Sequence, residues 1–488
     1  MLGWLLTTRL RRPCSNFRPY TYAKVRSFPS PVTGGSLAVL ALCPAGAGGS
    51  ANMALAFWSS ARALTVRAVP CQAIFFSPLI TLAQPHSASK SPMPPSTLCR
   101  PAVLRTLTNA CLTPKRFASS APSASQPAQS PCAPRHLLSI SDLLPSELTT
   151  LVRNASKYKT AVKSHAVPPH LQARLMAQTV AIMFTKRSTR TRVSTEGAIA
   201  MMGGNPMFLG SQDIQLGVNE SLYDTSVVIS SMVSAIVARV NAHDDVATMA
   251  KHSSKPVINA LSDLYHPLQS IADFQTLLEA FPSSESAGAE SLGLEGLKIA
   301  WVGDANNVLF DLAIGAAKLG VEVAVATPKG YEIPDFMRNI IKSTSPNFKL
   351  TETHEPAEAV KNADVLVTDT WVSMGQEAEA KKRLQDFAGF QITKELAQRG
   401  GAKESWKFMH CLPRHPEEPD AQVQVADEVF YSPASLVFQE AENRLWAAVA
   451  ALEAFVVNKG EVIPAEISEQ IHAGRVKAMM EKLTGKSS

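Results

Sequence analysis

The stretch "QTVAIMFTKRSTRTRVSTEGAIAMMGG", residues 178–204, joins a short apolar run to a dense group of cations and hydroxyls. The run at 178–184 predicts a buried strand, and the spacing of apolar residues beyond it predicts a helix ending at Gly203 and Gly204. The side chains between strand and helix are Lys186, Arg187, Ser188, Thr189, Arg190, Thr191 and Arg192. A strand, a polar loop and a helix in this order are typical of an α/β fold.

The polar loop lies where a parallel sheet binds its ligands. Ser188 and Thr189 fall near the predicted helix start, where free backbone N–H groups and the helix dipole favour an anion. Arg190 adds a planar, two-pronged donor that matches phosphate oxygens. The pattern predicts a phosphate site without the glycines of a nucleotide-binding loop. The alternative is a solvated basic helix start in which Ser and Thr serve only as caps.

Strand and helix patterns alternate along the chain from His136. The expected strands are 178–184, 235–240, 256–261, 298–304, 321–328, 364–371 and 406–413. A first helix is expected within 136–159, with Ser141 or Asp142 as its cap, and another at 307–320. The Ser-, Gly- and Glu-rich break at 281–296 separates two series of strands. We therefore expect an α/β protein of two lobes, each a parallel sheet flanked by helices, with the active site in the cleft between them.

Polar residues recur at the ends of the other expected strands, where ligands of parallel sheets sit. Arg239 stands inside an apolar run and is costly there unless it faces an anion or a carboxylate. His266 precedes a proline at a helix start, one turn before Gln269; a capping role is the alternative for this histidine. In the second lobe the corresponding residues are Asn306, Asn307, Asp369, Ser373, Met374, His410 and Cys411. The two asparagines are equally ordinary as a turn.

The charge is divided unevenly between an N-terminal extension and the body. Residues 1–141 contain no Asp or Glu and hold 14 of the 47 Lys and Arg residues, so the rest carries 33 basic and 41 acidic side chains. The basic whole-chain balance is therefore no evidence for a nucleic-acid partner. Six of the seven cysteines also lie in the extension, which leaves Cys411 alone in the body and excludes a disulfide framework there. No spacing of Cys and His predicts a metal site.

The extension, residues 1–135, is expected to be disordered and to act as a mitochondrial targeting segment. From Met93 it interleaves Arg and Lys with apolar residues and lacks acids, which is typical of a transit peptide directed to the matrix. Residues 1–92 are not needed for this role, and an extension of the gene model upstream of Met93 is the alternative. The uncharged run at 27–60 is interrupted by prolines and glycines, which argues against a membrane span.

Five motifs in order, "STRTR", "HPLQ", "DTWVSMGQE", "HCLPR" and "EAENR", closely resemble the ornithine carbamoyltransferase family from about His136 to the C-terminus. The Ser-Met-Gly loop and the Cys of "HCLP" are similar to the ornithine branch, and the aspartate branch is the alternative. The resemblance implies that 136–281 binds carbamoyl phosphate and 297–434 binds ornithine. It also implies that 435–488 forms helices returning to the first domain.

The resemblance implies transfer of the carbamoyl group to the side-chain amine of L-ornithine, giving citrulline and phosphate in arginine biosynthesis. Cys411, Arg190 and His266 would be catalytic. The residues expected to bind carbamoyl phosphate are Ser188, Thr189, Arg190, Thr191, Arg239, His266, Gln269, Cys411, Leu412 and Arg444. Those expected to bind ornithine are Asn307, Asp369, Ser373 and Met374. No metal or other cofactor is implied.

The family is usually a homotrimer whose neighbouring subunit supplies a loop, which residues 210–221 match. Gln215 stands in this loop where some relatives have histidine. An amine of the lysine type has a pKa of about 10.4, so the attacking amine must lose a proton. Whether Cys411 accepts that proton or only positions the amine is left open by the sequence. A non-catalytic binding protein on the same fold is the other class of function, while the missing glycine fingerprint argues against a dehydrogenase.

Overall fold

The computed structural model describes residues 133–164, 166–211, 220–282, 291–372, 379–414 and 424–484. All of them belong to one compact unit, residues 119–488. The predicted extension up to residue 132, Gln215, Ser373 and Met374 lie outside the described residues. None of the described helices is long and apolar enough to cross a membrane.

The first sheet has four parallel strands in the order β2-β1-β3-β4. The strands are β1 Thr179–Phe184, β2 Asn205–Gly210, β3 Ala235–Arg239 and β4 Val257–Leu261. The helices of this part are α1 Pro145–Lys163, α2 Thr189–Met201, α3 Leu222–Met232, α4 His243–His252 and α5 Pro267–Ala280. The central strands β1 and β3 are almost fully buried, which explains their continuous apolar sequence.

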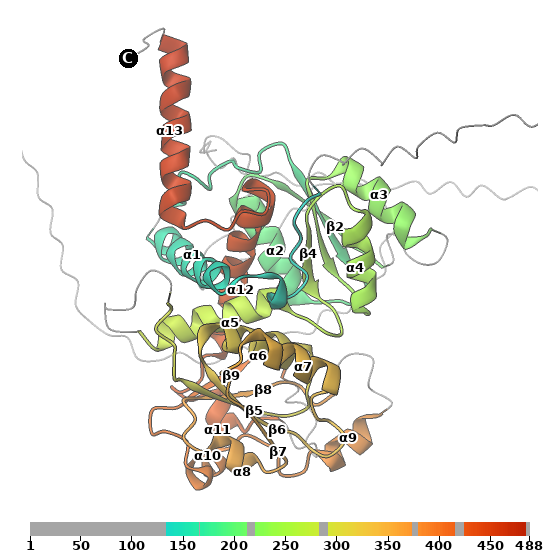
Figure 1. Ribbon diagram of the computed structural model, residues 1–488, viewed down its shortest axis with the longest axis vertical. Coiled ribbons are helices and arrows are strands. Elements are labelled where there is room, and N and C mark those ends of the chain that lie inside the picture. Colours follow the sequence, from blue (N-terminus) through green and yellow to red (C-terminus); the bar gives the residue numbers. More distant parts are fainter. Residues whose placement is uncertain are drawn as a thin grey trace, which may run out of the picture. The chain divides into compact units, whose positions relative to one another are not determined.

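The second sheet has five parallel strands in the order β7-β6-β5-β8-β9. The strands are β5 Lys298–Val302, β6 Glu322–Ala326, β7 Leu350–Thr353, β8 Val365–Thr368 and β9 Lys407–His410. Its helices are α6 Asn307–Leu319, α7 Asp335–Thr344, α8 Pro356–Val360, α9 Ala380–Asp386, α10 Lys394–Gly400 and α11 Asp427–Phe430. The two parallel sheets, seen in Figure 1, confirm the predicted α/β class.

Both sheets contain a point where the strand order reverses. In the first sheet it lies between β1 and β3, and in the second between β5 and β8. Loops leaving adjacent strands at such a point diverge and open a crevice at the carboxyl edge of the sheet. The loops after these four strands begin with Thr185, Val240, Gly303 and Asp369. The topology therefore directs the predicted site motifs toward two crevices.

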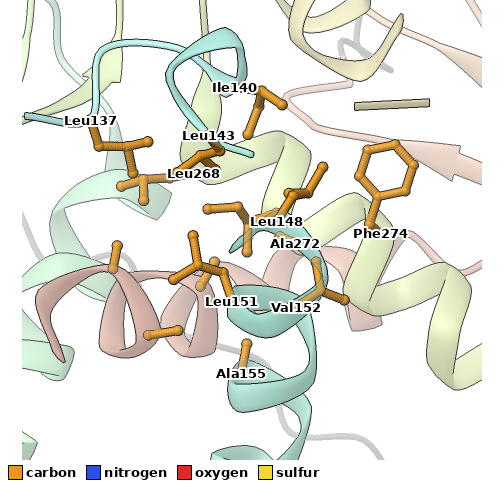
Figure 2. Packing of buried hydrophobic residues seen from close by; sticks show 14 of the residues in the cluster. Leu137, Ile140, Leu143, Leu148, Leu151, Val152, Ala155, Leu268, Ala272 and Phe274 are labelled. Atoms are coloured by element: carbon orange, nitrogen blue, oxygen red, sulfur yellow. The ribbon is translucent and has the colours of Figure 1, made fainter. Parts of the chain in front are cut away.

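The helices α5 and α6 pack against each other and join the two sheets in one apolar core. A Cβ atom on Gly315 of α6 would lie 2.3 Å from Cε2 of Phe274 on α5, so only glycine permits this approach. Figure 2 shows Phe274 in the same cluster as Leu148 and Val152 of α1 and Leu268 of α5. The first lobe is thus held close to the second by the helix that also carries His266 and Gln269.

After the second sheet the chain returns to the first lobe. The helix α12, Val437–Leu452, packs against α1, α2 and α5 (Figure 1). It continues as a π-helical turn at Glu453–Val457, and α13 follows at Ala465–Thr484. Near this turn Arg135 pairs with Glu147, donates to the carbonyl of Gly460 at 3.0 Å and covers the ring of Phe455. Ordered contacts therefore already include Arg135, which the sequence placed in the extension.

The structure corrects two local predictions. The long first helix is not capped by Ser141 or Asp142: it begins at Pro145, and Ser139 caps a separate 3-10 turn at Ile140–Asp142. The carboxylate of Asp142 is used within that turn, where it accepts the backbone N–H groups of Leu138 and Ser139. The strands β2 and β7 were not predicted. Both are edge strands with half-exposed residues, so they lack a continuous apolar run.

Candidate active site

A pocket of about 350 Å³ lies at the carboxyl ends of strands from both sheets. Twelve of the fourteen residues predicted for the site line it: Ser188, Thr189, Arg190, Thr191, Arg239, His266, Gln269, Asn307, Asp369, Cys411, Leu412 and Arg444. The other two, Ser373 and Met374, lie outside the described residues. Residues more than 250 positions apart in the chain thus meet in one cavity.

The loop after β1 ends at a helix N-terminus. Ser188 is the N-cap of α2, and its hydroxyl accepts the backbone N–H of Thr191 at 3.3 Å. The N–H groups at the start of α2 point toward the loop, where the helix dipole is positive. From the same turn Arg190 reaches across the pocket, and its Nη2 donates to the carbonyl of Leu412 at 2.6 Å. The loop after β1 and the loop after β9 are therefore joined by one arginine.

Three arginines, Arg190, Arg239 and Arg444, line the pocket. Burial, and then the nearby charges of Arg444 and Arg190, lower the pKa of Arg239 to about 10. Burial, and then the charge of Arg190, likewise lower the pKa of Arg444 to about 10. The Nε atoms of Arg239 and Arg444 are buried and make no hydrogen bond to the described part of the chain. Buried cations with unused donors favour a multiply charged anion in the pocket.

His266 is held at the N-cap of α5 by a buried carboxylate. Its backbone N–H donates to Oδ2 of Asp311 on α6 at 2.7 Å, while Oδ1 of Asp311 accepts the N–H of Ile140. Burial, and then the charges of Arg444, Arg239 and Arg190, lower the pKa of His266 well below its ordinary value. The imidazole is therefore neutral at pH 7. Arginine can only donate, so Nη1 of Arg444 donates to Nε2 of His266 at 3.3 Å.

Asp369 and Cys411 form the other end of the pocket. The carboxylate of Asp369 accepts Nδ2 of Asn306 at 2.9 Å and the Cys411 thiol at 3.0 Å. Burial, and then the Asp369 and Glu440 charges, raise the pKa of Cys411 well above its ordinary value. Cys411 is therefore a neutral thiol that donates to a carboxylate. It is not a thiolate poised to accept a proton near pH 7.

Two further predicted residues are placed by their backbone. Asn307 is the first residue of α6, and its Nδ2 donates to the carbonyl of Ser262 at 2.5 Å, a contact between the two lobes. Leu412 has φ of +62°, and its N–H donates to Nδ1 of His410 at 2.9 Å. Its carbonyl is thereby turned toward Arg190. Asn307 and Leu412 therefore line the pocket at positions that the backbone of α6 and of the loop after β9 determines.

Asp369, His410 and Cys411 also offer ligand-type atoms within 4.8 Å of one another. A carboxylate, an imidazole and a thiolate are a donor set that zinc accepts. Metal binding would, however, require loss of the proton that the raised pKa keeps on Cys411.

Comparison with family models decides the relationship. Residues 135–279 match the model of the aspartate/ornithine carbamoyltransferase, carbamoyl-P binding domain, and residues 295–455 match the Asp/Orn binding domain of the same family. The chain belongs to the aspartate/ornithine carbamoyltransferase family. The two matched segments contain the first and the second parallel sheet of this carbamoyltransferase fold, respectively.

Curated relatives within the family are similar over most of their length. The chain is 66% identical over 382 residues to the mitochondrial ornithine carbamoyltransferase of Aspergillus niger, covering 78% of this chain and all of the relative. It is 55% identical over 335 residues to the mitochondrial enzyme of Schizosaccharomyces pombe, covering 68% and 97%. These values confirm the predicted resemblance to the ornithine branch of the family.

Solved structures give the same result. A mitochondrial ornithine carbamoyltransferase from Coccidioides immitis is 64% identical with a TM-score of 0.62, covering 68% of this chain and all of that one. The ornithine carbamoyltransferase from Pyrococcus furiosus is 41% identical with a TM-score of 0.60, covering 67% and 98%. The predicted two-lobed carbamoyltransferase fold is confirmed by these likenesses.

Sequence reasoning missed residues that support the site. Asp311, Asp273 and Glu440 are buried carboxyl groups in contact with His266 or Gln269. A signal existed for two of them: Asp273 lies four residues after Gln269 on one helix face, and Glu440 opens the quoted "EAENR".

Proposed function

We propose that this chain transfers the carbamoyl group of carbamoyl phosphate to the side-chain amine of L-ornithine, giving L-citrulline and phosphate. One observation carries the proposal. A single pocket has a helix N-terminus and three arginines on one side and the Asp369–Cys411 pair on the other. Such a pocket suits a phosphate at one end and an amino acid with an ammonium group at the other.

The phosphate end supports binding of carbamoyl phosphate in the first lobe. Ser188, Thr189 and Thr191 offer hydroxyl and backbone donors at the start of α2, and Arg190 offers a planar fork. Arg239 and Arg444 add charge in surroundings with little water, where electrostatic attraction is stronger than in bulk. We assign residues 136–281, with the returning helices in 435–488, to this half of the site.

The reaction needs no covalent intermediate. The neutral amine attacks the carbonyl carbon, a C–N bond forms and the carbonyl oxygen becomes an oxyanion. The C–O bond to phosphate then breaks, phosphate leaves with the bonding electrons, and the extra proton of the attacking nitrogen passes to the departing phosphate. Donors from Arg190, His266 and Arg444 stabilise the oxyanion, because fixed donors in a closed site need no reorganisation as charge develops. The neutral state of His266 is compatible with donation from one ring nitrogen.

The amino-acid end favours ornithine over aspartate. Asp369 supplies a carboxylate suited to an ammonium group, whereas the side-chain carboxylate of aspartate would be repelled by it. Because Cys411 keeps its proton, we assign it a positioning role and not the role of the base. We assign residues 297–434, including Asn307, Ser373 and Met374, to this half.

A homotrimer is the assembly that we propose. The first lobe exposes apolar side chains on α2, β2 and α3, namely Val193, Met207, Tyr223, Val227, Val228 and Met232. An apolar area of this kind favours contact with another copy of the chain. Residues 210–221 follow β2 directly and would reach the neighbouring pocket, as the family resemblance implies. Sedimentation equilibrium measures the number of copies.

The relatives named as mitochondrial support a mitochondrial location. The matrix and a role in arginine biosynthesis are what the family resemblance implies. We expect import and cleavage between about Arg116 and Arg135, since Arg135 already contacts the folded body. N-terminal sequencing of the protein purified from its source measures the cleavage point. Recovery of an intact Met1 would contradict both the import and the cleavage.

The proposed activity is measured as citrulline formed from carbamoyl phosphate and ornithine by the purified chain. Turnover is expected with ornithine and not with aspartate. Binding of both ligands without any product would instead favour a non-catalytic binding protein on the same fold.

A further inference from the structure

Two buried carboxyl groups lie directly behind the pocket, on the helices α5 and α12. Asp273 stands on α5, one turn after Gln269, and Glu440 stands on α12, one turn before Arg444. Both carboxyl side chains are at least 97% buried. Neither lines the pocket, so neither is expected to touch a substrate.

Both carboxyl groups hold the same amide. Nε2 of Gln269 donates to Oδ1 of Asp273 at 2.8 Å and to Oε1 of Glu440 at 2.9 Å. Oε1 of Gln269 accepts Nη1 of Arg444 at 2.6 Å. The reversed amide would place its oxygen against two carboxyl groups and its NH2 against a guanidinium. The network therefore admits one orientation of Gln269, in which the oxygen keeps a second lone pair for a donor in the pocket.

Glu440 reaches a second part of the site. Its Oε2 accepts the backbone N–H of His410 at 2.9 Å, at the end of β9 and directly before Cys411. The same side chain therefore connects the amide that lines the carbamoyl phosphate half with the strand that carries the thiol of the other half.

From this geometry we propose that Asp273 and Glu440 are positioning residues, which fix the Gln269 oxygen toward the carbamoyl NH2 group and hold the end of β9 in register with it. The inference rests on the proposed carbamoyl transfer and deepens it.

The protonation of the pair agrees with this role. Burial raises the pKa of Asp273 to about 7 and that of Glu440 well above its ordinary value, and the two groups hydrogen-bond to each other. At neutral pH the pair therefore keeps at least one proton. The two carboxyl groups share that proton, while the oxygens of Glu440 accept from Gln269 and His410.

This arrangement predicts opposite outcomes for two isosteric substitutions. In Asp273→Asn, the amide oxygen still accepts from Gln269 and the NH2 donates to an ionised Glu440, so every donor keeps an acceptor. In Glu440→Gln, the new NH2 must face either Nε2 of Gln269 or the N–H of His410, and one buried donor loses its acceptor. A lost buried hydrogen bond of this kind is worth about 10- to 100-fold in a binding constant.

The experiment measures carbamoyl phosphate binding by calorimetry, and kcat and KM for both substrates, in the full mature enzyme. Glu440→Gln is expected to lose about 10- to 100-fold in affinity and in kcat/KM for carbamoyl phosphate. Asp273→Asn is expected to lose no more than about threefold, and Asp273→Leu, which offers no acceptor, at least tenfold. If the Glu440→Gln chain does not fold, the difference in carbamoyl phosphate affinity between Asp273→Asn and Asp273→Leu tests the positioning role.

Glu279→Gln is the matched control. Glu279 is a part-buried carboxylate on α5. Like Asp273 and Glu440 it does not line the pocket, but its hydrogen-bond partners are Lys159, Gln275, Gln439 and Asn443 instead of Gln269 and His410. Its substitution is expected to lower the melting temperature without changing KM. If the variants at 273 and 440 behave like this control, or if Asp273→Asn loses as much as Glu440→Gln, the positioning role is wrong. If the unmodified enzyme makes no citrulline, the proposed function fails instead.

Discussion

Replacing Arg190 by lysine is expected to weaken carbamoyl phosphate binding by about 1.5–3 kcal/mol, roughly 10- to 100-fold, with little change in the stability of the ligand-free enzyme. Lysine keeps the charge but loses the planar fork. It also loses the hydrogen bond that Arg190 donates to the carbonyl of Leu412 at 2.6 Å. Calorimetric titration with carbamoyl phosphate measures the affinity, and thermal unfolding without ligand measures the stability.

Arg399→Lys is the matched control for this change, because Arg399 is an exposed arginine on α10 that does not line the pocket. It is expected to keep the affinity of the unmodified enzyme. Normal affinity in Arg190→Lys as well would mean that the phosphate lies elsewhere and that the cations after β1 are solvated surface charges.

Replacing Cys411 by serine is expected to lower kcat/KM for ornithine by about 10- to 100-fold while carbamoyl phosphate still binds. The shorter hydroxyl side chain does not reproduce the 3.0 Å contact with Asp369, so the carboxylate is less well placed for the substrate ammonium group. Steady-state kinetics with each substrate varied separates the two effects. A variant that loses only thermal stability, with unchanged ornithine kinetics, would mark Cys411 as a core thiol.

The raised pKa of Cys411 gives a pH dependence for its alkylation. The thiolate is the reactive form, and a pKa raised above the ordinary value leaves little thiolate at pH 7. Iodoacetamide is therefore expected to react slowly at pH 7 and progressively faster as the pH rises through the alkaline range. Norvaline is an ornithine analogue that lacks the side-chain amine. Carbamoyl phosphate and norvaline together are expected to occupy the pocket and to slow the alkylation further. Rapid alkylation at pH 7 would show that Asp369 and burial do not hold the proton.

The predictable part of this fold followed from strands buried on both faces. Residues 178–184 and 235–240 were recognised because central parallel strands are continuously apolar, and β1 and β3 lie there. The edge strands β2 and β7 were missed, since half-exposed residues weaken the apolar signal. The N-terminus of α1 was misplaced because the sequence offers Ser and Asp caps, whereas the structure uses them in a separate 3-10 turn before Pro145.

The predicted site residues come together because they follow strands on either side of the two reversal points. Ser188 follows β1, Arg239 ends β3 and Asp369 follows β8, and parallel strands present their carboxyl ends at one edge. Their chemical roles stay predictions. The supporting carboxyl groups Asp273 and Glu440 escaped notice, since an acidic residue inside a helix usually faces water. Here both are buried where α5 packs against α12.

The central claim is that one pocket joins carbamoyl phosphate to ornithine, and competition between amino acids measures it most directly. The purified mature enzyme is given carbamoyl phosphate labelled at the carbonyl carbon, with ornithine and aspartate at equal concentration, and the products are separated by mass spectrometry. Because Asp369 attracts an ammonium group and repels a carboxylate, we expect the label in citrulline, with phosphate released in equal amount. Label in N-carbamoyl-aspartate, or in no amino acid at all, would contradict the account.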